Sequence, residues 1–168
     1  MSASSDVDEL LVLDGLRVEI GGRAVVTGLD LTVRAGRITA LVGESGSGKS
    51  MTALATIGLQ PRVAEVHGSA RLGGQELVGR SAQEMRRIRS GRIGMIFQEP
   101  GQSLSPVMKV SAVFRDVLAV REGMRGAAAV RRRTRELLDS VGLPDSARTA
   151  RSYPHELPGG ELQRGVIA

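Results

Sequence analysis

The sequence contains no cysteine and no tryptophan, and its other aromatic residues are one tyrosine and two phenylalanines. Without cysteine there is no disulfide, no cysteine-ligated zinc site and no iron–sulfur cluster. The two histidines, His67 and His155, are too few and too far apart in the sequence for a metal cluster, so a metal ion would have to arrive with a ligand. Few aromatic side chains also leave little to stack on bases, which argues against a protein that binds single-stranded nucleic acid.

Long apolar runs are missing as well. No stretch reaches the roughly eighteen consecutive apolar residues of a membrane-spanning helix, and the N-terminal MSASSDVDE has neither the basic nor the apolar segment of a signal peptide. We therefore expect a cytoplasmic protein. The net charge of +5 is compatible with nucleic acid, an anionic membrane surface or plain solubility, so it does not discriminate among functions.

The front of the chain predicts strands that lead into a glycine-rich loop. Apolar and polar residues alternate over residues 10–20 and again over residues 29–33, with a turn-like GGR at residues 21–23, which predicts an antiparallel β start. Residues 38–42 are a short apolar run that is typical of a buried strand. This run passes directly into GESGSGKS and then into the helix-compatible MTALATIGL.

Local signals continue after this loop. The glycine pair at residues 73–74 lies between apolar positions and predicts a hairpin. Ser81 and Glu84 have the spacing of a capping box, so a short basic helix should start there. Residues 93–97 predict a second buried strand, which ends at Gln98.

The back of the chain is predicted to be helical. Apolar residues recur at helical spacing between arginines over residues 110–141. Gly142 and Pro144 follow as a typical stop signal. The sequence therefore divides into a β and α/β front, about residues 6–99, and a helical part joined to it through a loop that contains glycine and proline.

Residues 43–50 match the phosphate-binding pattern GxxxxGK(S/T), and the match lies between a predicted strand and a predicted helix. Glycines allow the backbone to curl with its N–H groups inward, and the following helix presents the positive end of its dipole. Lys49 would hold a positive charge against the β- and γ-phosphates, and the Ser50 hydroxyl would take one position around Mg²⁺. The alternative is a glycine-rich turn that only caps a helix. The residues expected to bind the nucleotide here are Gly43, Glu44, Ser45, Gly46, Ser47, Gly48, Lys49, Ser50 and Met51.

Such a loop also fits kinases, GTPases and many ATPases, and two later segments narrow the choice. These are RIGMIFQEP, which precedes the helical part, and LPGGELQRGVIA, which begins at Leu157. The order of loop, strand ending in glutamine, helices and a segment like LSGGQxQR resembles an ABC-type nucleotide-binding domain. GESGSGKS, FQEP followed by SLSP, and YPHEL resemble the ATP-binding subunits of peptide and nickel importers. The resemblance covers residues 10–168, which correspond to the first half or so of such a subunit.

The resemblance implies an α/β fold of the ABC-ATPase type. It consists of a P-loop NTPase core with an antiparallel β subdomain and an inserted α-helical subdomain, with the C-terminal half absent. Residues 1–168 would then be a partial nucleotide-binding domain. Its β and P-loop core spans about residues 6–99, its helical subdomain about residues 100–160, and its signature segment residues 157–168.

The resemblance also assigns roles to single residues. In the family, the glutamine that matches Gln98 touches the magnesium ion or the attacking water and relays the nucleotide state to the helical subdomain. Lys49 and Gln98 are thus the expected catalytic residues, and Ser50 and Gln98 the expected metal ligands. Ile20 stands where the family usually has an aromatic residue that stacks on adenine. An aliphatic side chain can pack there but has no π-face, and Ile20 should be a buried strand residue in any case.

Two such domains bind ATP head to tail in the family, so the signature of one chain acts on the ATP of the other. In this sequence Pro158 replaces the usual serine and Glu161 the usual glutamine. Proline offers neither hydroxyl nor N–H, and a carboxylate repels a triphosphate. A degenerate site and a tolerated variant both remain open, since proline also suits the start of a helix. The segment comprises Leu157, Pro158, Gly159, Gly160 and Glu161.

The function implied is that of an ATP-binding, energy-coupling subunit of an ABC importer for peptides or nickel. Its cofactors would be ATP and Mg²⁺, and its partners a second ATP-binding subunit and transmembrane permease subunits. It would act at the inner face of the cell membrane. The Walker B and H-loop residues have no matching positions, so this chain alone is expected to be inactive. One alternative is a nucleotide-binding but catalytically incompetent fragment. The other is a non-transport ABC ATPase acting on DNA, for which the basic cluster Arg131, Arg132, Arg133 and Arg135 could speak, although no nucleic acid is expected.

Overall fold

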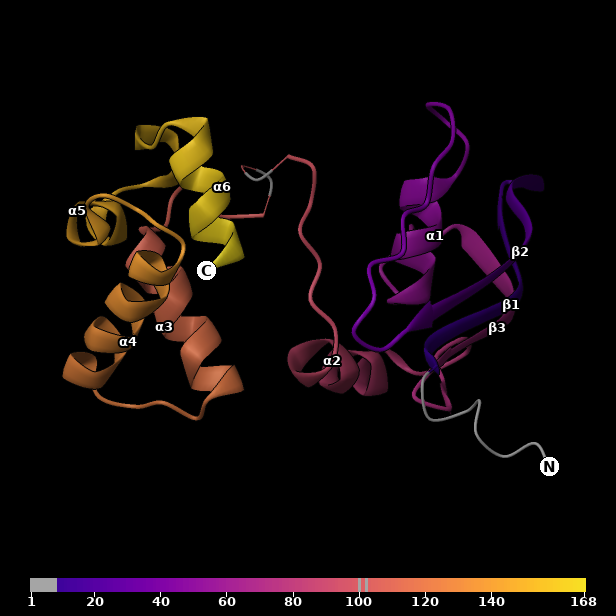
Figure 1. The fold of residues 1–168 in the computed structure, drawn as a ribbon, viewed down its shortest axis with the longest axis horizontal. Coiled ribbons are helices and arrows are strands. Elements are labelled where there is room, and N and C mark those ends of the chain that lie inside the picture. The colour runs from indigo at the N-terminus through magenta and orange to yellow at the C-terminus, as the bar shows by residue number, and fades with distance from the viewer. Residues whose placement is uncertain (1–8, 100, 102) are drawn as a thin grey trace. The chain divides into compact units, whose positions relative to one another are not determined.

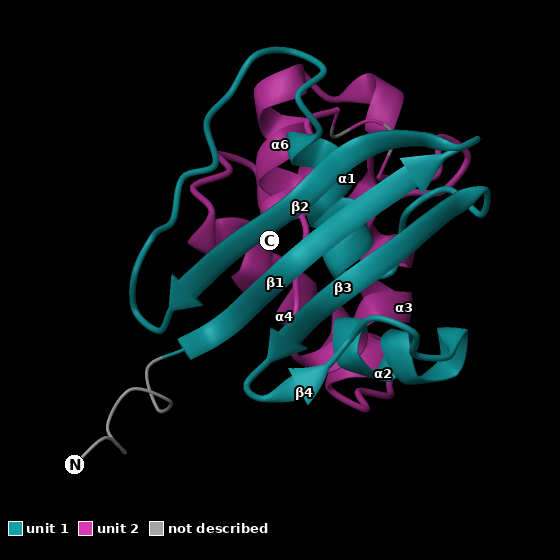
Figure 2. Ribbon diagram, turned by 90° about the vertical axis from the view of Figure 1, so that its right-hand side faces the viewer, with its two compact units in different colours: residues 1–89 teal, residues 90–168 magenta. Residues whose placement is uncertain are grey.

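A computed structural model describes residues 9–99, 101 and 103–168. The chain forms two compact units, unit 1 with Met1–Arg89 and unit 2 with Ser90–Ala168. They are coloured teal and magenta in Figure 2. Each unit has a core of its own and is described by itself.

Unit 1 is built on one antiparallel sheet in the order β2-β1-β3-β4. The strands are β1 (Glu9–Ile20), β2 (Arg23–Arg34), β3 (Ala64–Leu72) and β4 (Gln75–Glu76). Between β1 and β2, Gly21 and Gly22 take positive φ angles of 56° and 75°, which residues other than glycine rarely adopt. The predicted antiparallel start and the predicted hairpin at residues 73–74 are both confirmed.

Helix α1 (Lys49–Thr56) covers one face of this sheet, as Figures 1 and 2 show. Its Ala55 packs with Val18 of β1 and Val26 of β2 in a buried cluster. The loop of residues 35–48 links β2 to this helix. Burial of α1 against the sheet therefore fixes the place where the glycine-rich loop ends.

Helix α2 (Ala82–Gly91) begins at the predicted capping box. The Ser81 amide donates to Glu84 Oε2 at 2.9 Å, and the Glu84 amide donates to Ser81 Oγ at 3.3 Å. The helix buries Met85 and Ile88. Its arginines are exposed or half-buried. This prediction is confirmed down to its two capping bonds.

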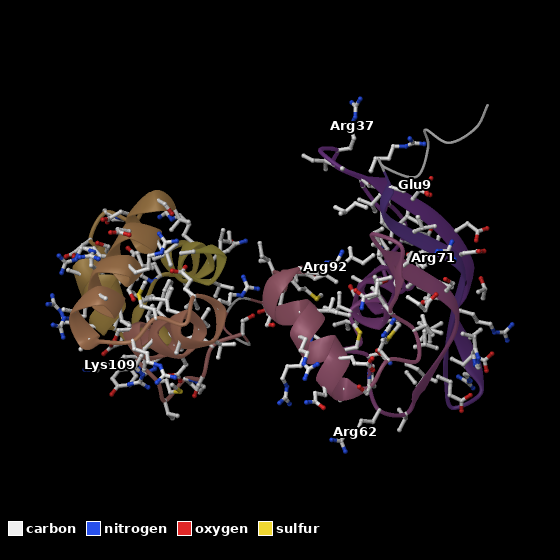
Figure 3. The ribbon with its side chains drawn as sticks, turned by 90° about the horizontal axis from the view of Figure 1, so that it is seen from below. Glu9, Arg37, Arg62, Arg71, Arg92 and Lys109 are labelled. Carbon is white, nitrogen blue, oxygen red and sulfur yellow. The ribbon has the colours of Figure 1, made fainter. Side chains whose placement is uncertain are left out.

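Unit 2 is helical. It contains α3 (Val110–Arg121), α4 (Ala127–Ser140), α5 (Ser146–Arg151), the short 3₁₀ helix η2 (Pro154–Glu156) and α6 (Gly159–Ile167). A buried cluster of Val110, Phe114, Leu138, Leu143 and Leu157 joins α3, α4 and the segment before α6. Lys109, labelled in Figure 3, stands before α3 with its Nζ 5.6 Å from the centre of the Tyr153 ring. The prediction that residues 110–141 are helical is confirmed, with a break between α3 and α4.

Two predicted strands are wrong. Residues 38–42 and 93–97 are neither strand nor helix, and neither segment pairs with a strand among the described residues. Ile38 is 100% exposed and Val42 88% exposed, while Ile96 is 55% exposed. An apolar run becomes a strand only when a neighbouring strand accepts its backbone hydrogen bonds, and a parallel neighbour is distant in sequence. The apolar composition of these two segments was therefore not sufficient to predict a strand.

Candidate functional site

The side chain of Lys49 lies across the glycine-rich loop. Its Nζ donates to the carbonyl oxygens of Gly43 at 2.7 Å and Glu44 at 2.6 Å, and to Ser47 Oγ at 3.3 Å. The Ser47 amide closes the loop by donating to the Glu44 carbonyl at 3.2 Å. The loop thus folds around an ammonium group that faces its interior.

Several backbone N–H groups of the loop remain available as donors. The amides of Gly46, Gly48, Lys49 and Ser50 donate to no residue in the described part of the chain. The last three open α1 or directly precede it, where the helix dipole is positive. Unpaired amides at a helix N-terminus, together with a lysine, form an arrangement that binds phosphate groups.

Gly48 is required at its position for two reasons. Its φ is 89°, and a Cβ built on it would lie 2.6 Å from the carbonyl oxygen of Val25 in β2. The loop therefore passes so close to the sheet that only glycine fits there. This contact joins the position of the loop to the position of β2.

Ser45 and Ser50 belong to the loop itself, whereas two further predicted nucleotide residues, Met51 and Ile20, lie in α1 and at the end of β1. Ser45 and Ser50 are exposed, and the Ser50 hydroxyl lies in the first turn of α1, where a cation held by phosphate oxygens could reach it. Met51 is half-buried and packs against the cluster around Val18. Ile20 ends β1 opposite Arg23 and Ala64. It is half-buried rather than buried, because it lies at the end of the strand.

A divalent cation at this loop would need a bound nucleotide to supply part of its ligands. The described residues contain no group of three or more histidine, aspartate or glutamate side chains able to hold a metal ion. The hydroxyl of Ser50 fits a magnesium shell as one oxygen ligand among several. The remaining ligands would have to come from phosphate oxygens, water or other residues.

The signature segment leads into α6 and forms its N-terminus. Leu157 is buried in the core of unit 2, whereas Pro158, Gly159 and Gly160 are exposed. Pro158 is the N-cap residue, and the amides of Gly159 and Gly160 donate to no described residue. A Cβ on either glycine would meet nothing within 4 Å. The segment therefore presents open backbone donors at a helix N-terminus.

The sequence did not reveal the partner of Glu161. This residue lies in the first turn of α6, and its carboxylate accepts a hydrogen bond from Nη2 of Arg148 in α5. The two positions are thirteen residues apart and lie in different helices, with η2 between them. No local pattern could have paired them, because the contact exists only after both helices pack.

The predicted site residues fall into both units. The loop, Ser50 and Ile20 belong to unit 1, and Gln98 and the signature to unit 2. Gln98 is exposed and lies in a bend after the segment of residues 93–97. The structure brings the loop residues together, and it brings the signature residues together.

The basic cluster of α4 is partly neutralised. Arg133 Nε lies 3.3 Å from Glu122, whose hydrogen bond and charge raise the pKa of that guanidinium above its usual value. Arg132 lies 3.7 Å from Glu136 in the next turn. Ion pairing of this kind is what a solvated helix face shows, and it lowers the charge available to a polyanion.

An antiparallel sheet, a phosphate-type loop that opens a helix, and a separate helical unit with a glycine-containing helix start define a nucleotide-binding cassette. The ABC transporter family model matches residues 26–168, and the chain belongs to that family. The family resemblance of the sequence motifs and the α/β fold class are both confirmed.

Curated relatives carry the name oligopeptide transport ATP-binding protein. The one from Mycobacterium tuberculosis is 44% identical over 168 residues, which is 100% of this chain and 27% of that protein. The one from Salmonella typhimurium is 39% identical over 170 residues, covering 99% of this chain and 50% of that protein. This chain therefore spans between about a quarter and a half of the length of these relatives.

Solved structures show the same fold. A bacterial ABC transporter cassette in a dimeric structure superposes with a TM-score of 0.79 at 23% identity, covering 94% of this chain and 67% of that one. A post-hydrolysis dimer bound to ADP and phosphate superposes with a TM-score of 0.78 at 24% identity, with the same coverage. Among the described helices of this chain, none combines the length and hydropathy needed to cross a bilayer.

Proposed function

We propose that this chain is the nucleotide-binding part of an ATP-binding, energy-coupling subunit of an ABC importer for peptides. The observation that supports this most directly is the loop of residues 43–50, in which Lys49 faces inward among unpaired amides. The relatives named as oligopeptide transport proteins supply the class of transported substrate. Nickel, the other substrate class that the motifs resemble, has no support among these relatives.

Nucleotide binding at the loop would replace the present hydrogen-bond acceptors of Lys49 with phosphate oxygens. A triphosphate would replace the carbonyl oxygens of Gly43 and Glu44 as acceptors of the Lys49 ammonium, and phosphate oxygens would accept from the amides of Gly46, Gly48 and Ser50. Ser50 and Gln98 would contribute oxygens to Mg²⁺, whose charge offsets that of the phosphates. Ile20 would pack against the base without stacking on it.

The signature segment would act on the nucleotide of a second subunit. Leu157 anchors it, and Gly159 and Gly160 present their amides. The proposed partners are therefore a second ATP-binding subunit and transmembrane permease subunits, at the inner face of the cell membrane. Nucleic acid is not a proposed partner, since the arginines of α4 are partly paired.

Binding without turnover is the proposed behaviour of this chain alone. Lys49 and the loop amides would hold the phosphates, whereas hydrolysis also requires a group that positions the attacking water at the γ-phosphate. Lys49 and Gln98 would take their catalytic roles in a longer chain. The proposal and the incompetent-fragment alternative make the same prediction for this chain. They differ for an extended chain, which only the proposal expects to hydrolyse ATP.

The test measures equilibrium binding of a fluorescent ATP analogue with Mg²⁺. Lys49→Ala should weaken binding roughly ten- to a hundredfold, because hydrogen bonds to charged groups contribute about 1.5 to 3 kcal/mol. Lys109→Ala is the matched control, because it removes the other lysine from a position in unit 2, and should bind within about twofold of wild type. Equal binding by Lys49→Ala and wild type would refute the assignment.

Turnover is measured in parallel on this chain and on a chain extended past Ala168. The proposal expects phosphate release only from the extended chain, and only with Lys49 present. Hydrolysis by the 168-residue chain that Lys49→Ala abolishes would show that these 168 residues already suffice for catalysis.

A further inference from the structure

An ion pair joins two helices of unit 2 at the start of the signature helix. Nη2 of Arg148 in α5 donates to Oε2 of Glu161 in the first turn of α6. The Glu161 side chain is only 16% exposed, whereas the Arg148 side chain is 45% exposed. The carboxylate is thus largely covered, and the arginine is the more accessible member of the pair.

Backbone hydrogen bonds and core packing fix the helices that carry both members of this pair. The Ser152 amide donates to the Arg148 carbonyl at 3.1 Å, and the Val110 amide donates to the Ser152 carbonyl at 3.0 Å, which ties α5 to α3. On the other side, Leu157 is buried in the unit 2 core, and Leu162 of α6 packs against the same core. The geometry of the pair therefore follows from the packing of one core.

The pair changes the electrostatic character of the α6 N-terminus. The amides of Gly159 and Gly160 would attract an anion through the helix dipole, but an uncompensated Glu161 in the same turn would repel it. Arg148 supplies the opposite charge at hydrogen-bond distance. Arg148 therefore offsets the charge of Glu161 at the end of the helix that would meet an anion.

We propose that Arg148 is a positioning residue for the signature segment. It holds the Glu161 carboxylate against α5 and neutralises it, so that the amides of Gly159 and Gly160 stay open to the triphosphate of a second subunit. Glu161 is then compatible with a working signature, which favours the tolerated variant over the degenerate site. This inference rests on the proposed function, because it presupposes that α6 meets a nucleotide.

The experiment measures association of two chains driven by Mg²⁺-ATP, by sedimentation over a range of protein concentrations. Arg148→Ala should raise the apparent dissociation constant about tenfold, because it leaves Glu161 unpaired beside the incoming phosphates. The same substitution in a Glu161→Gln background should change it less than about twofold, since no carboxylate remains to be neutralised. A coupling of this size between the two positions is what a double-mutant cycle detects.

Arg151→Ala serves as the matched control, because Arg151 lies in the same helix, is exposed, and makes no ion pair with a described residue. It should change association less than about twofold. Thermal unfolding of every variant verifies that unit 2 is folded. If Arg148→Ala weakens association equally in the wild-type and Glu161→Gln backgrounds, the proposal is overturned. An Arg148→Ala variant that associates as wild type does would overturn it as well.

Binding of the fluorescent ATP analogue to the unassociated chain distinguishes this proposal from the proposed function. Wild type that binds nucleotide through Lys49 but does not associate would leave the loop assignment standing and would overturn the role of Arg148. Wild type that binds no nucleotide would overturn the proposed function and, with it, this inference.

Discussion

Gly48 joins the phosphate-type loop to the sheet at the scale of one residue. Its φ of 89° and the 2.6 Å between a built Cβ and the Val25 carbonyl oxygen leave no room for a side chain. Gly48→Ala should therefore destabilise unit 1 by about 1 to 3 kcal/mol, the usual cost of a non-glycine residue held in a strained backbone conformation. Urea unfolding followed by circular dichroism measures this, and nucleotide affinity should fall as well.

Gly91→Ala provides the comparison for that measurement. Gly91 ends α2 without a positive φ, and a Cβ there would meet nothing within 4 Å. Its substitution should change stability by no more than about 0.5 kcal/mol. If Gly48→Ala proves equally mild, the loop can move away from β2, and the close approach does not fix its position.

The capping box of α2 makes a prediction at the scale of an element. Hydrogen bonds from Ser81, first from its hydroxyl and then from its amide, together with the Arg80 guanidinium, lower the pKa of Glu84 from 4.5 to about 2. A carboxyl group whose pKa falls on folding stabilises the folded state above its unfolded pKa. That contribution is complete above about pH 4.5 and is lost as the pH falls toward about 2.

Glu84→Gln should therefore lose less stability than wild type between pH 4.5 and pH 2. Urea midpoints collected across this window measure the difference. Ser81→Ala removes the hydroxyl donor and should also flatten the curve. Parallel curves for wild type and both variants would mean that the cap does not set the pKa of this carboxyl group.

Elements with local causes could be predicted from the sequence, and elements with distant causes could not. The hairpin at residues 73–74 and the capping box of Ser81 and Glu84 depend on neighbours within a few positions, and the structure confirms them. Residues 38–42 have the composition of a strand, but a strand also needs a neighbouring strand to pair with. The composition of the segment does not show whether such a neighbour exists. The phosphate-type loop is a local pattern too, whereas Arg148 reaches Glu161 only through the packing of α5 and α6.

At the scale of the whole molecule, the segment of residues 38–42 is an exposed apolar surface. Ile38 is 100% exposed, Val42 88% and Leu41 40%. Figure 3 shows the neighbouring Arg37 with its side chain directed away from the sheet. Adjacent exposed apolar residues with unpaired backbone groups favour association with another chain. The chain should therefore self-associate through this segment unless a partner covers it.

Ile38→Lys tests this expectation. A fully exposed side chain loses no burial on substitution, so the free energy of unfolding should stay within about 0.5 kcal/mol of wild type, while self-association measured by light scattering should fall. Val63→Lys is the control for added charge, because Val63 is 70% exposed in the same unit but lies outside the segment. An equal fall with Val63→Lys would assign the effect to net charge. A fall confined to Ile38→Lys would assign it to residues 38–42, because only there does the lysine interrupt adjacent exposed apolar side chains.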